Sequence, residues 1–293
     1  MKIGFIGFGE AGYTIARGLG ESGVTDICAY DVNTHTPGLG EKIRRQAEEC
    51  KVTLVDSNAL LANSADVLFS TVTADCALAA ANQTAPHLKP HHCYADLNSV
   101  SPGLKQSIAQ VITASGARFV EVAIMSAVLP HGHRVPMLLG GPSAQALADL
   151  LTPFGMRLEV LPGEIGAAAA TKMCRSIIIK GLEALVLECL LAAHKYGAED
   201  RVLSSLAETF PEIAWPKLAG YMIGRVAVHG ARRAREMEEV AETLRDAGIE
   251  PIMAEAIARR QDWGASLDLT KYVDQDQLED YREVLKITEK LTK

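Results

Sequence analysis

The sequence predicts an α/β protein in two parts: a doubly wound parallel sheet in residues 1–162, followed by an all-α domain in residues 163–293. Three observations support this fold class. A short apolar run, Lys2–Ile6, leads directly into a glycine-rich turn. Short apolar runs then alternate with helical patterns as far as residue 161, which is typical of a sheet whose strands are joined by helices. From residue 164 onward the pattern is helical throughout.

The glycine-rich turn reads Gly7-Phe8-Gly9-Glu10-Ala11-Gly12, and residues 13–19 after it have helical spacing. A strand, a G-x-G-x-x-G turn and a helix in this order form the dinucleotide-binding loop of a Rossmann-type domain. The first glycine allows a tight turn, the second lets a pyrophosphate approach the backbone, and the third lets the helix pack closely on the strand. The first N–H groups of that helix then face the phosphates. We therefore predict that residues 7–12 bind a dinucleotide.

A second apolar strand, 27–30, ends in Asp31, which lies at about the 20-residue spacing at which a carboxylate accepts hydrogen bonds from the adenosine ribose. Because this carboxylate would repel a 2′-phosphate, the sequence favours NAD, with NADP as the alternative cofactor. Arg44 and Arg45 lie too far downstream to be predicted as phosphate ligands. Thr73, just after a later strand, is a further predicted cofactor contact.

The other elements follow in order. Ser57 is a predicted helix cap, Pro86 ends a helix, and Gly248 with Pro251 ends another. The further strands are expected at 52–55, 67–72, 92–97, 118–124 and 136–140, and the helices between them at 41–50, 58–63, up to 85, and 104–115. The C-terminal helices are expected at 165–194, 200–210, 216–246 and 251–263, with a polar, peripheral segment from Asp268.

Three segments each follow the end of a predicted strand: 71–75, 98–102 and 126–133. Ligands of open parallel sheets bind beyond the carboxyl ends of the strands. We therefore expect these segments to line one crevice.

Four segments resemble the β-hydroxyacid dehydrogenase superfamily, which includes 3-hydroxyisobutyrate, tartronate semialdehyde and 6-phosphogluconate dehydrogenases. They are the glycine loop; residues 96–102 (Asp-Leu-Asn-Ser-Val-Ser-Pro), similar to the family's D-x-S-T-x-x-P; residues 120–141; and residues 166–172 (Gly-Ala-Ala-Ala-Ala-Thr-Lys), similar to its lysine-bearing helix start. The helical remainder, with residues 229–237, resembles an uncharacterised branch known only as 6-phosphogluconate dehydrogenase-like.

Lys172 is the predicted catalytic residue. An ammonium group in the first turns of a buried helix is costly unless it faces a cleft or a partner. Desolvation would lower its pKa toward the range of a general base. From position alone, the alternative is a lysine whose stem packs while its head reaches solvent. The resemblance favours catalysis, in which Lys172 exchanges the proton of the substrate hydroxyl.

The resemblance also implies a set of substrate ligands: Asn98, Ser99, Ser126 and Arg175 would orient a carboxylate. Three of these four positions, and the two residues that follow Ser126, depart from the family pattern. Asn98 and Ser99 replace its serine and threonine, Arg175 replaces its asparagine, and Ala127-Val128 replaces its glycines. Arg175 adds a fixed charge and a fork suited to a carboxylate or phosphate. The departures therefore concern the substrate more than the reaction class.

His229, Arg232, Arg233 and Glu236 recur at helical spacing, so one helix face would carry all four. Two interpretations are open: a solvated surface, or a cationic face that holds an acidic substrate. His131 and His133, in the loop after Ser126, are weaker candidates. The histidines are not spaced as metal ligands on any one helix, and no metal site is predicted.

Composition narrows the class of protein. The 293 residues carry a formal net charge of −7, which argues against nucleic acid or an anionic membrane as the partner. The six cysteines show neither CxxC nor zinc spacing, so we expect reduced thiols and a cytoplasmic protein without a signal peptide. The most apolar long stretch, 176–193, carries Lys180, Glu183 and Glu188, and is predicted as a buried helix.

The sequence thus predicts an NAD(P)-dependent dehydrogenase acting on the CH–OH group of a small anionic hydroxy acid. Hydride would pass between C4 of the nicotinamide and the carbinol carbon, and decarboxylation would follow if that carbon is β to a carboxylate. The alternatives are an imine reductase-type enzyme and a non-catalytic NAD(P)-binding sensor, which would have no need of Lys172. We expect a homodimer, because the helix from Ile165 buries more surface than one small helical domain can cover.

Overall fold

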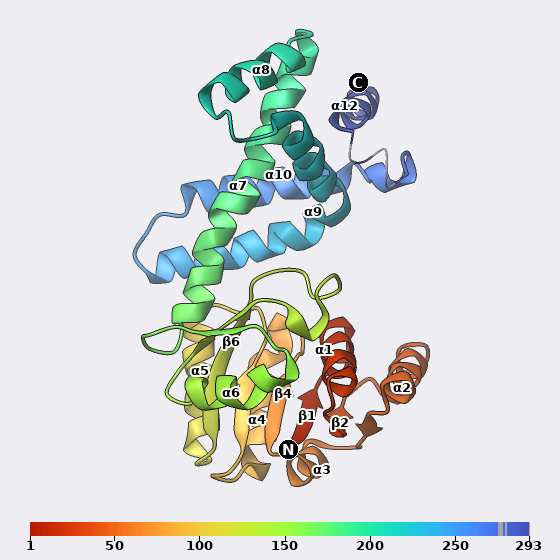
Figure 1. The fold of residues 1–293 in the computed structure, drawn as a ribbon. Coiled ribbons are helices and arrows are strands. Elements are labelled where there is room, and N and C mark those ends of the chain that lie inside the picture. The colour runs from red at the N-terminus through yellow and green to blue at the C-terminus, as the bar shows by residue number, and fades with distance from the viewer. Residues whose placement is uncertain (275–277, 279, 293) are drawn as a thin grey trace. The chain divides into compact units, whose positions relative to one another are not determined.

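A computed structural model describes residues 1–274, 278 and 280–292 of the chain, which form two compact units, Met1–Lys172 and Met173–Lys293 (Figure 1). The division falls inside the long helix α7 (Ala167–Lys195). The domain boundary after residue 162 stays a prediction.

Unit 1 contains one eight-stranded sheet in the order β3-β2-β1-β4-β5-β6-β7-β8. Its strands are β1 (Lys2–Ile6), β2 (Asp26–Tyr30), β3 (Thr53–Leu54), β4 (Val67–Ser70), β5 (Cys93–Asp96), β6 (Arg118–Ile124), β7 (Met137–Gly140) and β8 (Leu158–Val160). Every neighbouring pair is parallel except β6 and β7. The predicted parallel sheet is therefore confirmed for its main part.

The antiparallel pair follows from the short connection before β7. Residues 125–136 contain one 3-10 helix, Gly132–Arg134, and no α-helix that could carry the chain back for a parallel crossover. Two later elements, α6 (Ala144–Leu151) and β8, were not predicted. At eight and three residues they are too short to give a clear periodic pattern.

Helices cover both faces of the sheet, which confirms the doubly wound arrangement. On one face, α1 (Glu10–Glu21), α2 (Leu39–Cys50) and α6 contribute Ile15, Ile43 and Leu147 to the core. On the other face, α3 (Asn58–Ser64), α4 (Ala77–Thr84) and α5 (Pro102–Ala114) contribute Leu61, Ala81 and Ile108. Ser57 caps α3 as predicted, accepting a hydrogen bond from the Leu60 N–H.

Unit 2 is helical, as predicted. It contains most of α7, followed by α8 (Glu199–Thr209), α9 (Trp215–Asp246), α10 (Ile252–Ser266) and α12 (Tyr281–Leu291). Within the described residues, no helix is long and apolar enough to cross a membrane.

The prediction of a peripheral segment from Asp268 is wrong for α12. Tyr281, Val284 and Leu285 are buried and belong to the same core cluster as Ile223 of α9. Their spacing is that of one apolar helix face, which the many charged residues between them obscure.

Candidate active site

The glycine loop has the geometry that its spacing predicts. Gly7 has φ +83°, and a Cβ there would lie 2.8 Å from the carbonyl oxygen of Thr71. A Cβ at Gly12 would lie 2.7 Å from the Gly7 carbonyl oxygen, whereas one at Gly9 would meet no atom within 4 Å. Gly9 is the N-cap of α1 and supplies no side-chain cap. The loop therefore leaves open space beside the first N–H groups of α1, which fits a pyrophosphate.

Asp31 is tied to the same loop by its carboxylate. The Phe8 N–H donates to Oδ2 at 2.7 Å and the Asn33 N–H donates to Oδ1 at 2.8 Å. Asp31 is half-buried. A carboxylate offers about four acceptor positions, so each oxygen keeps capacity for a ligand hydroxyl. The arrangement orients Asp31 without using up its acceptors.

Arg44, which is not predicted as a phosphate ligand, contacts the segment after Asp31. Its Nη1 donates to the Thr34 carbonyl oxygen at 2.5 Å. Thr34 lies three residues beyond Asp31 and donates its hydroxyl to the Asp31 carbonyl oxygen. Helix α2 thus places one of its side chains against the loop that precedes it.

The end of β4 contacts the glycine loop through a residue that the sequence did not single out. The Thr71 hydroxyl donates to the Gly7 carbonyl oxygen at 2.7 Å. Thr73, the predicted contact, is exposed at the start of a 3-10 helix, Ala74–Cys76. Glu10 and Ala11 lie in the first turn of α1, as the motif requires.

Lys172 and Ser99 are brought together. The Lys172 Nζ donates to the Ser99 Oγ at 3.0 Å, although 73 positions separate the two residues. Ser99 is exposed in the loop between β5 and α5, and half-buried Lys172 lies near the start of α7. An amine and a hydroxyl thus meet beyond the carboxyl end of β5, where this class of sheet binds ligands.

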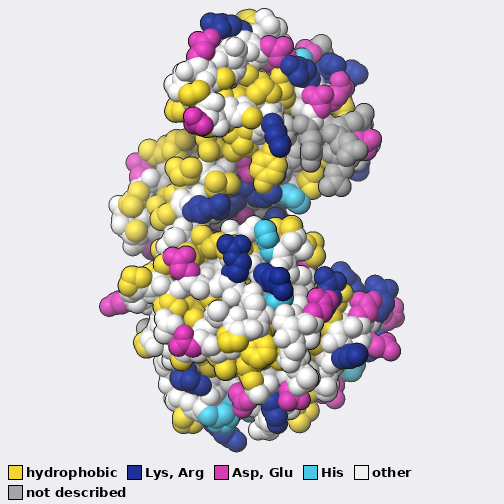
Figure 2. All heavy atoms as spheres, viewed as in Figure 1, with side chains coloured by type: hydrophobic (Ala, Val, Ile, Leu, Met, Phe, Trp, Pro, Cys, Tyr) yellow, Lys and Arg dark blue, Asp and Glu magenta, His cyan; other side chains and the backbone are white. Residues whose placement is uncertain are grey.

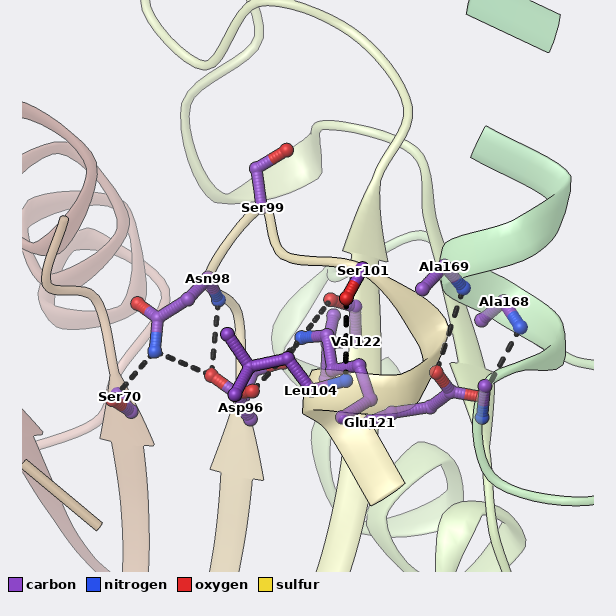
Figure 3. A network of polar contacts seen from close by, with 12 residues as sticks. Ser70, Asp96, Asn98, Ser99, Ser101, Leu104, Glu121, Val122, Ala168 and Ala169 are labelled. Atoms are coloured by element: carbon purple, nitrogen blue, oxygen red, sulfur yellow. Dashed lines mark hydrogen bonds and ion pairs between the residues drawn. The ribbon is translucent and has the colours of Figure 1, made fainter. Parts of the chain in front are cut away.

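A buried network behind Ser99 holds that loop (Figure 3). The Asn98 N–H and Nδ2 donate to the Asp96 Oδ1 at 3.1 and 2.5 Å, and Nδ2 also donates to the Ser70 Oγ at 2.9 Å. On the other side, the Lys105 Nζ forms an ion pair with the Asp96 Oδ2 at 3.1 Å and donates to the Asp96 carbonyl oxygen at 2.7 Å. Asp96 and Lys105 are 0% and 1% exposed.

This network changes the role predicted for Asn98. Both hydrogens of its amide group are already donated within the network, and the free atom is the acceptor Oδ1. An acceptor cannot bind a substrate carboxylate, so the predicted contact does not fit this arrangement. Asn98 instead fixes the backbone that carries Ser99. Lys105 lies on the apolar face of a predicted helix, and a lysine at such a position indicates a buried partner.

Glu121 of β6 holds the start of α7 (Figure 3). Its Oε1 accepts from the N–H groups of Gly166 at 2.8 Å and Ala168 at 3.1 Å, and its Oε2 accepts from the Ala169 N–H at 3.4 Å. Glu121 is fully buried. A Cβ at Gly140 would lie 2.3 Å from the Oε1, so the neighbouring strand needs glycine there. The signal in the sequence was a glutamate inside an apolar strand.

The loop after β6 contains the other candidates of unit 1. Ser126 and His131 are exposed in it. His133 is buried, and its Nε2 lies 3.0 Å from both the Ser22 Oγ and the Phe154 carbonyl oxygen. Burial lowers the pKa of His133. These contacts attach the loop to α1 and give His133 a structural role.

In unit 2, Arg233 is part of a buried cluster around Glu183. The Arg233 guanidinium binds both carboxylate oxygens of Glu183, with Nε to Oε2 at 2.7 Å and Nη2 to Oε1. Arg225 and Gln261 also donate to Glu183, at 3.2 and 2.9 Å. Arg233 is 4% exposed. Its guanidinium is committed to Glu183, so the predicted substrate contact does not fit this arrangement either.

The residues of the predicted cationic face therefore lie partly in the core and partly on the surface. Arg232 is exposed and donates to the Glu236 Oε1 at 2.9 Å, and the buried Lys180 pairs with the other oxygen of Glu236 at 3.0 Å. Burial, then the neighbouring Arg232 and Arg225, lower the pKa of half-buried His229.

Arg175 is exposed on α7. Among the described residues, no group of three or more His, Cys, Asp or Glu side chains could hold a metal ion.

Comparison with protein families agrees with this geometry. The model of the NAD binding domain of 6-phosphogluconate dehydrogenase matches residues 2–155, more than half of the chain. The chain belongs to the β-hydroxyacid dehydrogenase superfamily. A domain of unknown function (DUF1932) matches residues 193–264, which places the chain in an uncharacterised branch of this superfamily. The nicotinamide-cofactor domain predicted from the glycine loop is thereby confirmed.

Three relatives illustrate the superfamily. A conserved hypothetical protein from Sinorhizobium meliloti 1021 is 36% identical, with a TM-score of 0.85 over 99% of this chain and 96% of its own. A protein described as structurally similar to 3-hydroxyacid dehydrogenases is 31% identical, with a TM-score of 0.78 over 91% of this chain and 97% of its own. The mitochondrial 3-hydroxyisobutyrate dehydrogenase of Drosophila melanogaster is 23% identical over 73% of this chain and 65% of its own length.

Proposed function

We propose that this protein is an NAD-dependent dehydrogenase of a small hydroxy acid, with Lys172 exchanging the proton of the substrate hydroxyl. The observation that carries the proposal is the 3.0 Å hydrogen bond from the Lys172 Nζ to the Ser99 Oγ. It lies in the same compact unit as the glycine loop and Asp31. Membership of a superfamily of hydroxy-acid dehydrogenases supports the reaction class.

The cofactor assignment rests on Gly9 and Asp31. The open space at Gly9 would admit the pyrophosphate, and the remaining acceptor positions of the Asp31 carboxylate would take the ribose hydroxyls. A 2′-phosphate at the same place would meet a negative charge. We therefore propose NAD as the preferred cofactor, as the sequence predicted.

The nicotinamide, when bound, supplies the hydride acceptor. In the oxidation, the carbinol carbon loses a hydride and the hydroxyl loses its proton to Lys172, which must be neutral beforehand. Ser99 accepts a hydrogen bond from Lys172 and keeps its own hydroxyl hydrogen to donate to the substrate. Ser99 would thus orient the substrate against the amine that removes its proton.

We further propose that the substrate is anionic and that Arg175 and Arg232 are its cationic ligands in unit 2. Both guanidinium groups are exposed, whereas that of Arg233 is enclosed with Glu183. A neutral His229 would offer a hydrogen bond rather than a charge, because its pKa is lowered. Ser126, exposed after β6, stays a proposed ligand of the substrate.

A homodimer is part of the proposal. Large apolar side chains of α7 are exposed, with Ile178 at 64% and Leu185 at 56%. Figure 2 shows hydrophobic side chains gathered on the surface of the helical unit. Two exposed apolar positions seven residues apart lie on one helix face, which a second copy of the chain would cover.

The test is a panel of 2- and 3-hydroxy acids, with one or two acidic groups, assayed by the absorbance of the reduced nicotinamide with NAD and with NADP. We expect turnover of at least one acid with NAD. Lys89→Ala is the matched control for Lys172→Ala. Lys89 is an exposed lysine that precedes the amino end of β5, whereas Ser99 follows its carboxyl end. If calorimetry shows NAD binding but no acid in the panel is turned over, a nucleotide sensor is the better description.

A further inference from the structure

We infer that Glu121 is a positioning residue for Lys172, which fixes both the place of the amine and the pH at which it loses its proton. The inference rests on the proposed role of Lys172 as the base. Glu121 lies in residues 120–141, one of the four segments that resemble the superfamily, but it is not among the residues to which the resemblance assigns a role. Three observations support the inference: the hydrogen-bond partners of the Glu121 carboxylate, its register with Asp96, and the groups that stabilise its negative charge.

The partners of Glu121 are backbone groups at the start of one helix. The carboxylate receives the N–H groups of Gly166, Ala168 and Ala169, and Lys172 follows Ala169 by three residues, close to one helical turn. These N–H groups belong to the part of a helix that has no partner of its own within the helix. Glu121 therefore fixes where α7 begins on the sheet and which way its first turns face.

Glu121 has a counterpart on the next strand. Asp96 and Glu121 are register partners on β5 and β6, and both are fully buried. Asp96 holds the loop of Ser99 through Asn98, and Glu121 holds the helix of Lys172. Figure 3 shows the two carboxylates reaching in opposite directions from neighbouring strands. The two ends of the Lys172–Ser99 hydrogen bond are thus anchored at one level of the sheet.

The negative charges of Glu121 and Asp96 are stabilised by different groups. Asp96 has the ammonium of Lys105 at 3.1 Å, whereas in the described part of the chain no cationic side chain forms an ion pair with Glu121. Its negative charge is stabilised by the N–H groups and the positive end of α7. Because that charge lies at the start of the helix that carries Lys172, we expect it to favour the protonated amine. Removing it should let Lys172 lose its proton at lower pH.

Two substitutions separate position from charge. Glu121→Gln keeps the length of the side chain and an oxygen for Gly166 and Ala168, but loses the charge. Glu121→Asp keeps the charge but withdraws the carboxylate by one methylene, so the contacts to α7 lengthen. Glu159→Gln removes an exposed carboxylate from β8 of the same sheet and is the matched control.

The experiment measures two pH dependences for each variant: kcat/KM with the best hydroxy acid, and the rate at which an amine reagent acylates Lys172, followed by mass spectrometry. For Glu121→Gln we expect both midpoints to move to lower pH by about one unit, the order of magnitude for one charge at a partly buried site. For Glu121→Asp we expect kcat to fall about tenfold or more through misplacement, with both midpoints near those of the wild type. Glu159→Gln should change neither.

The outcomes are separable. If Glu121→Gln leaves both midpoints in place, Glu121 does not act on Lys172 and the inference is overturned. Should Glu121→Gln fail to fold, Glu121→Asp still tests the positioning role, and an unchanged kcat in that variant would overturn it. If the wild type turns over no hydroxy acid, the proposed function fails, while the acylation profile still tests the link between Glu121 and Lys172.

Discussion

Two buried glutamates, one in each unit, are held in opposite ways. Glu121 and Glu183 are 0% and 1% exposed. The donors to Glu121 are backbone N–H groups at the start of α7 and just before it, at residues 166, 168 and 169. The donors to Glu183 are side chains: two guanidinium groups, of Arg225 and Arg233, and the amide of Gln261.

The difference separates two uses of a buried charge. Backbone donors fix a stretch of main chain, so Glu121 positions a helix start and the reactive lysine on it. Side-chain donors join elements, so Glu183 of α7 binds two residues of α9 and one of α10 into one core. Cationic residues on a helix face can therefore stabilise the packing of the core as well as bind anions. Arg233 stabilises the core through Glu183.

The largest expected effect lies at the helix start that Glu121 holds. Lys172→Ala should lower kcat by about 10²- to 10⁴-fold, the usual range for a general acid or base, because the proposed acceptor of the hydroxyl proton is lost. NAD affinity should stay near that of the wild type. Steady-state kinetics and calorimetry measure the two quantities. A Lys172→Ala enzyme with an unchanged kcat and pH profile would remove Lys172 from the mechanism.

The next largest effect concerns the core of unit 2. Glu183→Ala leaves the guanidinium of Arg233 buried without its carboxylate, and breaking a buried pair in this way costs about 3–5 kcal/mol of unfolding free energy. Denaturant unfolding measures that loss. Glu188→Ala is the control on the same helix: Glu188 is exposed and pairs with Arg260, so its loss should cost less than about 1 kcal/mol. Equal losses in the two variants would show that the Glu183 cluster is not a structural centre.

The contrast between these two glutamates also marks what the sequence could predict. Local signals sufficed for the glycine loop, for strands β1 to β7 with helices α1 to α5, and for helices α7 to α10, because each depends on spacing within a short segment. Long-range pairing had no such signal. Glu121 lies 45 positions from Gly166, and Glu183 lies 50 positions from Arg233, so neither contact follows from periodicity. The antiparallel pairing of β7 with β6 was missed for the same reason.

Buried polar residues were nevertheless visible as exceptions. Glu121 interrupts an apolar strand, and Lys105 occupies the apolar face of a helix. A charge at such a position needs a partner, so each predicts a network without saying which residues form it. The site residues divide accordingly. Lys172 and Ser99 form a hydrogen bond, while Asn98 and Arg233 are held by partners that only the fold supplies.

A third carboxylate sharpens the comparison. Asp31 accepts backbone N–H groups as Glu121 does, but it is only half-buried and keeps acceptor positions for a ligand. Asp31→Ala should weaken NAD binding by about tenfold to a hundredfold, since a hydrogen bond to a charged group contributes about 1.5–3 kcal/mol. The substitution should also reduce the ratio of NAD affinity to NADP affinity. Calorimetry with NADH and NADPH measures both effects. Tighter binding of NADPH than of NADH by the wild type would refute the assignment.

The smallest effect is expected for Arg232, the exposed member of the cationic motif. Its neighbour Arg233 is buried. Arg232 is 63% exposed on its side chain and pairs with Glu236 four residues along the helix, so Arg232→Ala should change the unfolding free energy by less than about 0.5 kcal/mol. If Arg232 binds the anionic end of the substrate, solvent screening limits its contribution, and KM should rise about two- to fivefold with little change in kcat. Arg235→Ala, another exposed arginine of α9, is the control and should leave KM unchanged. Equal KM values for the two variants would show that Arg232 does not bind the substrate and that its face of α9 is solvated surface. Of the two proposed cationic ligands, only Arg175 would then remain.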